Sequence, residues 1–397
     1  MEEEKMRIVK TILKDVKNKG DLAVKKYTAR FDKVELRSLE VSKKAIARAY
    51  NKVDKTTLNA LKKAAKNIKY FAKQQLKSVK SFEIKKNKIL LGQKIIPLQR
   101  VGCYVPGGRY PLPSSALMSI IPARVAGVKE IIICSPKIKP ITIVAADLSG
   151  ADRIFRVGGI QAIAAMAYGT KTIPKVDKIV GPGNKFVAAA KKEVFGSVGI
   201  DCIAGPSEIM IIADNFAKPE FIAADLIAQA EHDPDAKVTL VTTSQALAKK
   251  VDREMKIQLK NLSTKEIAKE ALKNRKIRIV KTINNAIEVA NAIAPEHLEL
   301  MIRNPKSIVN KLKNYGSLFL GNYSAEVFGD YCSGPNHILP TNQAAKYTGG
   351  LSIFDFIKIV TTQQMTKQGA KKLIKNTAKL AEIEGLEGHK KAALIRD

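Results

Sequence analysis

The chain has 397 residues, of which 45% are hydrophobic and 27% charged, a globular rather than a disordered composition. The formal net charge of +32 would suit a nucleic-acid-binding protein, but the lysines are spread along the chain and Trp is absent, which disfavours that function. No apolar run is long enough to span a membrane. The four widely spaced cysteines argue against a disulfide framework or a Cys-type zinc site. We therefore expect a cytoplasmic protein built from two or more packed units.

The first part of the chain predicts helices, followed by an alternation of strands and helices. Residues 5–80 have apolar residues at helical spacing, and short strands are expected at 84–91 and 94–98. The alternation then has strands at 100–105, 130–134, 153–157 and 178–180, with helices at 161–168 and 185–195. Short apolar strands that alternate with helices predict a parallel sheet covered on both faces.

A second alternation begins after Gly205, where we expect a tight crossing between units. It has strands at 208–213, 238–242, 278–280 and 317–320, and helices at 218–231, 244–259 and 285–292. From Gly350 onward the chain is expected to be mostly helical. The sequence thus predicts an α/β protein with two doubly wound, Rossmann-like domains and helical N-terminal and C-terminal extensions.

The four histidines give the strongest functional signal, because each lies beside carboxylates, amides or glycines: His232, His297, His337 and His389. Such settings favour metal or proton chemistry over a structural role. Gln229 and His232 share a helix face and could hold one ion. Asp330, in a loop rich in turn-forming residues, is a further candidate ligand, and this N/O set suits zinc or another divalent transition ion.

The sequence around His297 suggests a proton shuttle, and the sequence around His389 suggests a tail that docks onto another surface. Pro295 suits the first turn of a helix, so Glu296 and His297 are expected at a helix N-terminus as a base and proton shuttle. The alternative for Glu296 is a simple capping carboxylate. Glu384 and His389 lie in a terminal segment that would normally fray, so a function there implies docking, for example onto a partner chain.

Several long motifs, taken in order, resemble the histidinol dehydrogenase family over residues 7–396. They are VGCYVPGG (101–108), VGGIQA (157–162), GPGN (181–184), AGPSE (204–208), QAEH (229–232), PEHL (295–298) and SGPNHILPT (333–341). The resemblance implies two incomplete Rossmann-like units and NAD bound away from a G-x-G-x-x-G loop, which neither glycine motif here forms. It also implies a homodimer whose C-terminal tail reaches the neighbour's active site.

The resemblance assigns roles to individual residues. Glu296 and His297 would be the catalytic acid/base pair. One zinc ion per subunit would be held by Gln229, His232, Asp330 and His389. The substrate, L-histidinol, would contact the zinc ligands, His297, and also Ser207, His337 and Glu384. NAD would contact Tyr104, Gln161 and Asn184.

The expected domains follow from these roles. Residues 1–102 and 208–350 are expected to form the domain with most zinc and catalytic residues, and residues 103–207 the domain that contributes NAD contacts. Residues 351–397 would serve dimerisation and the partner's active site.

The predicted function is the NAD-dependent four-electron oxidation of L-histidinol to L-histidine via L-histidinaldehyde, the last steps of histidine biosynthesis. One alternative is a paralogous zinc- and NAD-dependent dehydrogenase for another hydroxylated substrate. Glu384 and His389 argue against it, because the resemblance expects them to recognise the imidazole end of the substrate. The other is a basic nucleic-acid-binding protein, which a steep salt dependence of DNA binding would reveal.

Overall fold

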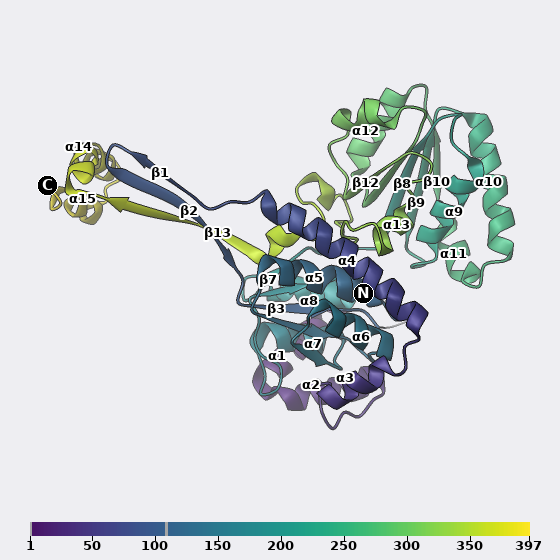
Figure 1. Ribbon diagram of the computed structural model, residues 1–397, viewed down its shortest axis with the longest axis horizontal. Coiled ribbons are helices and arrows are strands. Elements are labelled where there is room, and N and C mark those ends of the chain that lie inside the picture. Colours follow the sequence, from purple (N-terminus) through teal and green to yellow (C-terminus); the bar gives the residue numbers. More distant parts are fainter. Residues whose placement is uncertain (1, 108–109) are drawn as a thin grey trace.

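The computed structural model describes residues 2–107 and 110–397, so Gly108 at the end of the first glycine motif lies outside the described residues. The described part contains two five-stranded sheets and one three-stranded sheet (Figure 1). All strand pairs of the two larger sheets are parallel. The prediction of an α/β fold with two Rossmann-like units is therefore confirmed.

The first sheet has the strand order β5-β4-β3-β6-β7, and the order reverses between β3 and β6. Ligands of doubly wound folds bind at such a switch point, outside the carboxyl ends of the strands. The strands are β3 (Arg100–Tyr104), β4 (Glu130–Cys134), β5 (Arg153–Phe155), β6 (Lys178–Val180) and β7 (Gly199–Ile200). The accompanying helices are α5 (Pro113–Ala126), α6 (Pro140–Ser149), α7 (Gly159–Tyr168) and α8 (Lys185–Val194).

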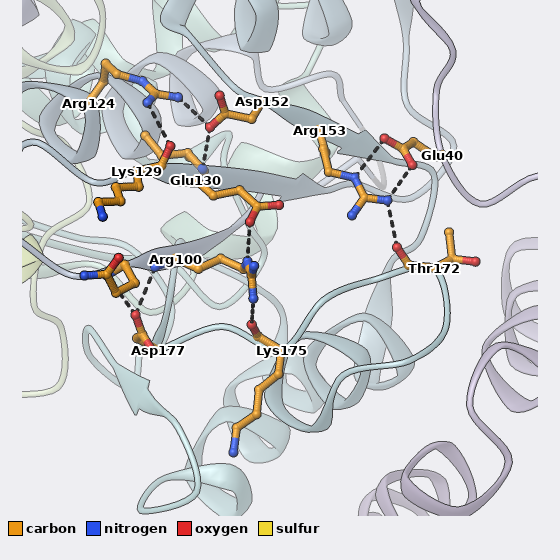
Figure 2. Close-up of polar contacts among 12 residues, drawn as sticks. Glu40, Arg100, Arg124, Lys129, Glu130, Asp152, Arg153, Thr172, Lys175 and Asp177 are labelled. Carbon is orange, nitrogen blue, oxygen red and sulfur yellow. Dashed lines mark hydrogen bonds and ion pairs between the residues drawn. The ribbon is translucent and has the colours of Figure 1, made fainter.

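Ion pairs close the amino edge of this sheet, as Figure 2 shows. Arg100 at the start of β3 contacts Glu130 at the start of β4, with Nε 2.5 Å from Oε2. Arg153 at the start of β5 makes a two-pronged pair with Glu40, at 2.9 and 2.6 Å, which ties the segment between α2 and α3 to the sheet. Because the amino edge is filled by these contacts, the carboxyl edge is left to bind ligands.

Four helices precede the first sheet and pack against its helices. They are α1 (Glu2–Lys19), α2 (Asp21–Asp32), α3 (Lys43–Tyr50) and α4 (Lys55–Lys77). α1 and α2 contact α7, α3 contacts α6, and α4 contacts α5. Residues 1–102 are expected to form one domain with residues 208–350. In the structure, however, the apolar faces of α1 and α2 share a core with α7 and α8 of the first sheet. The division of functions between the units stays a prediction.

The second sheet has the order β10-β9-β8-β11-β12. Its strands are β8 (Glu208–Ala213), β9 (Lys237–Thr242), β10 (Lys276–Ile279), β11 (His297–Met301) and β12 (Ser317–Leu320). Its helices are α9 (Pro219–Ala230), α10 (Gln245–Lys260), α11 (Lys265–Leu272), α12 (Ile283–Ile293) and α13 (Glu326–Tyr331), and the 3-10 helix η1 (Pro305–Lys311) precedes β12.

Two local expectations are wrong in this unit. His297 begins a strand rather than a helix, because β11 is buried along its whole length between β8 and β12 and its apolar residues Leu298 and Leu300 enter the core. Asp330 lies in α13 rather than in a loop. His297 and Asp330 of the candidate site therefore lie on a strand and a helix rather than at a helix N-terminus and in a loop.

A long arm forms the third part of the molecule. Strands β1 (Phe82–Lys86), β2 (Ile89–Pro97) and β13 (Ile357–Met365) form an antiparallel sheet. The arm projects from the two α/β units and carries α14 (Lys367–Ile383) and α15 (Glu387–Leu394) at its far end (Figure 1). The short 3-10 helices η2 (Ala344–Lys346) and η3 (Ile353–Phe356) precede β13. The expectation of a mostly helical end is wrong for β13, whose β-branched residues pair with β2.

The segment 201–207 joins the carboxyl edge of the first sheet to the amino edge of the second. Gly205 in this segment packs closely against Asn342, whose Nδ2 would lie 2.0 Å from a Cβ at this position. Its backbone N–H donates to Thr341 Oγ1 at 2.6 Å. Burial raises the pKa of Cys202 in this segment to about 12, and the charges of Asp201 and Glu296 also raise it. Asp201 follows β7 of the first sheet and Glu296 precedes β11 of the second, so the two edges are close. In the described part of the chain, no helix is long and apolar enough to cross a membrane.

Candidate active site

His297 is the centre of a buried polar cluster at the amino edge of the second sheet. The parallel register places it opposite Ile209, and its ring Nδ1 lies 3.1 Å from the carbonyl oxygen of Glu208. A carbonyl can only accept, so Nδ1 carries a proton and Nε2 is the basic nitrogen of the neutral ring. Within the described residues Nε2 makes no hydrogen bond, and Asp330 Oδ1 lies 3.4 Å from it. The ring therefore presents a buried nitrogen that lies within ion-pair distance of Asp330.

Glu296 lies beside this ring and is itself buried. Its Oε2 accepts from the backbone N–H of Glu208 at 2.8 Å and lies 3.7 Å from His297 Nδ1. Burial raises the pKa of Glu296 to about 7, although the neighbouring His297 lowers it. A carboxyl group with this pKa can accept and return a proton near neutral pH.

Helix α13 brings two further carboxyl groups to the ring. Glu326 and Asp330 are one helical turn apart, and Glu326 Oε2 lies 3.9 Å from His297 Nδ1. Burial lowers the pKa of His297, but the charges of Glu296, Glu326 and Asp330 together raise it well above its ordinary value. Burial would raise the pKa of Asp330, but His297, with His337 and His232, lowers it. The cluster therefore favours a protonated imidazole among carboxylates.

Two acids that the motifs did not reveal lie behind Glu326. Glu299 Oε1 accepts from the backbone N–H of Glu326 at 2.8 Å. Burial raises the pKa of Glu299 well above its ordinary value and that of its neighbour Asp225 to about 6. Their sequence signal was weak but present: Glu299 shares a strand face with His297, and Asp225 is an acid in the apolar middle of helix α9.

Of the four predicted zinc ligands, Gln229 and Asp330 belong to this cluster and His232 lies within range of its charges. The Gln229 amide nitrogen, turned toward Glu326, donates to its two carboxylate oxygens at 2.8 and 2.9 Å, which directs the amide oxygen away from the carboxylate. His232 is exposed just beyond α9, and its charge acts on Asp330. An amide oxygen, an imidazole and a carboxylate fit a zinc-type ion. Across residues 2–107 and 110–397, however, no three His, Cys, Asp or Glu side chains are grouped to hold a metal.

The predicted substrate residues fall into two groups. His337 Nδ1 lies 2.8 Å from the carbonyl oxygen of Asp330, and Ser207 directly precedes Glu208 at the start of β8, so both are near the cluster. Glu384, directly after α14, and His389, in α15, are exposed at the end of the arm opposite the second α/β unit (Figure 1). One chain therefore does not bring its own tail residues to its cluster.

The three predicted NAD residues lie at the carboxyl edge of the first sheet. Tyr104 ends β3 and its hydroxyl accepts from Gly159 N–H at 3.1 Å. Gln161 in α7 is buried, and its Oε1 has no hydrogen-bond partner within the described residues. Asn184 caps α8 by accepting from the backbone N–H groups of residues 186 and 187. An unpaired buried oxygen beside two helix N-termini fits a dinucleotide site.

A buried ion pair fixes the loop that leads to Asn184. Lys191 Nζ pairs with Asp201 and donates to the carbonyl of Gly181 at 3.0 Å. Asp201 Oδ2 accepts from Gly181 N–H at 2.7 Å. Both peptide groups of Gly181 are thus held, and Gly181 itself has φ of 112° and no room for a Cβ, which would lie 2.1 Å from Tyr104 O. The motifs pointed to this loop but not to the ion pair.

A doubly wound α/β protein with a buried histidine–carboxylate cluster beside a nucleotide-type sheet edge has the features of a dehydrogenase. A histidinol dehydrogenase family model matches residues 1–397. A histidinol dehydrogenase of Methanocaldococcus jannaschii is 47% identical over 399 residues, covering 99% of this chain and 93% of that protein. One of Clostridium acetobutylicum is 49% identical over 398 residues, covering 98% of this chain and 92% of that protein.

A solved structure agrees with these relatives. The crystal structure of histidinol dehydrogenase from Elizabethkingia anophelis matches with a TM-score of 0.94 and 41% identity, covering 98% of this chain and 91% of that chain. The chain belongs to the histidinol dehydrogenase family, and its class is oxidoreductase.

The buried acid Asp225 should give folding stability a specific pH dependence. Its pKa is about 6 in the folded chain and about 3.9 when unfolded, so the folded state binds more protons between these values. The stability that this group contributes is present at low pH and is lost as pH rises through about 6. Between about pH 4 and pH 8, wild type should therefore lose about 1–3 kcal/mol relative to Asp225→Asn.

Denaturant unfolding of both proteins across this pH range measures the difference. The exposed Asp235→Asn variant is the matched control, and it should follow wild type. If the difference in unfolding free energy between wild type and Asp225→Asn does not change with pH, Asp225 does not gain protons on folding.

Proposed function

We propose that this chain catalyses the NAD-dependent four-electron oxidation of L-histidinol to L-histidine through L-histidinaldehyde, the last steps of histidine biosynthesis. The observation that carries the proposal is the buried Nε2 of His297, 3.4 Å from Asp330 Oδ1, together with the neighbouring Glu296, whose pKa burial raises to about 7. Membership of the family supports histidinol as the substrate. The cytoplasmic location stays a prediction.

In the first step, His297 in its neutral form would remove the proton of the substrate hydroxyl. A cation bound next to Asp330, such as zinc, would offset the carboxylate charges that raise the pKa of the ring. Its Nδ1–H is directed at the Glu208 carbonyl, so Nε2 is the nitrogen that accepts the proton. The surrounding carboxylates stabilise the imidazolium that forms. NAD⁺ would supply the acceptor for the hydride that leaves the same carbon, which turns the alcohol into the aldehyde.

In the second step, Glu296 activates water to attack the aldehyde. Its pKa near 7 lets it take a proton from water, and its bond to Glu208 N–H holds the other side of the carboxylate. The resulting hydrate would lose a second hydride, for which a second NAD⁺ would supply the acceptor, and two protons, one to the acid/base pair and one to water, which gives the carboxylate. Each positioned proton-transfer group should contribute about 10²–10⁴ in rate.

Gln229, His232, Asp330 and the tail residue His389 of a second copy would hold the zinc ion. Zinc in this position would supply a positive template that keeps the substrate and the reactive aldehyde in place between the two steps. The Gln229 amide is already oriented by Glu326, so its oxygen needs no rearrangement to serve as a ligand.

A homodimer with exchanged tails would complete the site. In one chain the arm holds Glu384 and His389 away from the cluster (Figure 1). The arm and its helices also expose large apolar side chains, namely Ile84, Leu91, Ile359, Leu380, Ile383, Leu386, Leu394 and Ile395. Exposed apolar surface of this extent suits a protein interface, and a two-fold dimer would bury it twice.

Metal removal should abolish the activity without unfolding the protein. The ligand donors lie on elements that the sheets and helices already fix, so the far-UV circular dichroism should stay nearly unchanged after chelation. NADH formation from histidinol, measured before chelation, after it and after zinc is restored, checks this. Full activity of a verified metal-free preparation would rule out the zinc assignment.

Substitution of the acid/base pair should affect the two half-reactions differently. Glu296→Gln should slow the oxidation of added histidinaldehyde more than aldehyde formation, because it removes the group that activates water. His297→Asn should slow the alcohol step at least as much, by about 10²–10⁴. The exposed Glu288→Gln serves as the control. Equal losses in both steps for both variants would contradict this division of roles.

Mixed dimers should show whether the tail acts in the neighbouring subunit. Glu296→Gln and His389→Asn homodimers should each be nearly inactive, because both of their sites carry one defect. In a mixed dimer with exchanged tails, one site collects both substitutions and the other none, so about half of the wild-type activity should return. Two affinity tags isolate the mixed dimer. If the purified mixed dimer binds zinc but regains no activity, the tail acts within its own chain.

A further inference from the structure

Glu208 contacts both members of the acid/base pair through its own backbone. It is the first residue of β8, and its N–H donates to Glu296 Oε2 at 2.8 Å. Its carbonyl oxygen lies 3.1 Å from His297 Nδ1, so the same residue also sets the orientation of the imidazole ring. A shift of this one residue would displace the carboxyl group and the ring together. The alignment of the pair therefore depends on what keeps Glu208 in place.

Regular structure holds the backbone of Glu208 on one side only. Segment 201–207 is irregular, and β8 begins at Glu208 itself. On the β9 side, the N–H of Lys237 donates to the carbonyl oxygen of Ser207 at 2.9 Å. The ends of helices and strands open more easily than their centres. A precise position for the start of β8 therefore calls for a further anchor.

The side chain of Glu208 supplies this anchor. Its carboxylate is buried, and Oε1 accepts from Lys237 Nζ at 2.7 Å and from the backbone N–H of Asn342 at 3.2 Å. Lys237 is the residue opposite Glu208 in the parallel register of β8 and β9. Its Nζ also donates to Asn342 Oδ1 at 2.8 Å. Glu208, Lys237 and Asn342 thus form a closed triangle of charge-assisted hydrogen bonds.

The loop that carries Asn342 is held against the start of β8 by further contacts. Thr341, which precedes it, accepts from the backbone N–H of Gly205 at 2.6 Å. Asn342 and Gln343 both have left-handed backbone conformations, with φ of 52° and 66°. Such conformations cost energy for residues with a Cβ and persist where the surrounding contacts enforce them. With this backbone the N–H of Asn342 donates to the Glu208 carboxylate, so the loop and the start of β8 are held together.

We propose that Glu208 is a positioning residue of the acid/base pair and that Lys237 is the cation that fixes it. The inference rests on the proposed function, because it concerns the proton transfers of Glu296 and His297. Glu208 itself transfers no proton, since its side chain is engaged by Lys237 and Asn342. A buried carboxylate that loses its cation is costly and moves toward water. Here that movement would carry the N–H and the carbonyl group of Glu208 away from the pair.

Hydrogen exchange of the Glu208 amide tests the anchor without any turnover. Mass spectrometry of overlapping peptides across residues 205–210 measures it. The Lys237 side chain is 55% exposed, so Lys237→Met removes the charge with little loss of packing. The Glu208 amide of this variant should exchange about tenfold faster than in wild type. Lys237→Arg keeps the charge and the donors and should exchange as wild type does.

The matched control is Lys276→Met. It removes an exposed lysine at the start of β10, on the same edge of the same sheet. The net charge changes as it does in Lys237→Met, but the triangle stays intact. Exchange of the Glu208 amide and turnover should both equal those of wild type.

Turnover gives the second readout. Lys237→Met should lower kcat for histidinol and for added histidinaldehyde by a similar factor, about ten- to a hundredfold, because both groups lose their alignment. KM for histidinol should stay within about threefold of wild type. Lys237→Arg should recover most of the kcat. An equal loss in the two steps is distinct from the unequal losses expected of Glu296→Gln and His297→Asn.

Two results would overturn the proposal: an unchanged exchange rate of the Glu208 amide in Lys237→Met, or a wild-type kcat in that variant. A merely structural salt bridge would lower the free energy of unfolding and leave the turnover of the folded enzyme intact. Glu208→Gln is a second variant, because its amide oxygen can still accept both hydrogen bonds, and its kcat should fall only about threefold. NADH formation by wild type with histidinol is measured in parallel. If wild type forms none, the proposed function fails, whereas normal wild-type turnover with an unaffected Lys237→Met overturns this inference alone.

Discussion

Burial of one imidazole among carboxyl groups is the constraint on which the rest of the active site depends. Glu296, Glu326 and Asp330 all lie within 4 Å of His297 ring nitrogens, at 3.7, 3.9 and 3.4 Å. Buried carboxylates are costly unless positive charge or hydrogen bonds compensate them. Burial raises the pKa of Glu296 to about 7 and that of Glu326 well above its ordinary value, so these groups hold protons unless a cation compensates them. The cluster therefore favours bound cations: a zinc ion and the amino and imidazole groups of a substrate such as histidinol.

The position of this cluster relates the two α/β units and the arm to one another. It lies at the amino edge of the second sheet, whereas ligands of doubly wound folds usually bind at a carboxyl edge. Segment 201–207 brings it to the carboxyl edge of the first sheet, where the predicted NAD residues lie, so a hydride acceptor on one unit can reach a substrate on the other. The arm holds the tail residues far from this junction (Figure 1), which is why a second copy is needed to complete the proposed site.

Motifs and residue types predicted the fold class and most of the cluster, because glycine-rich turns and isolated histidines are local signals. The rest depended on distant segments. Pro295 suggested a helix at His297, but pairing with β8 and β12 makes it a strand. β13 was missed because its partner, β2, lies far away in sequence. Glu299, Glu326 and the Lys191–Asp201 pair acquire a role only when packing brings them beside His297 or Gly181.

The central claim is that a single buried acid/base centre carries out both oxidations before the product leaves. The ratio of NADH formed to histidinol consumed, measured with excess NAD⁺ and with histidine quantified in the same reaction, tests this most directly. We expect two NADH and one histidine for each histidinol consumed, with no aldehyde accumulating in solution. One NADH per histidinol with free histidinaldehyde, or no histidine, would contradict it.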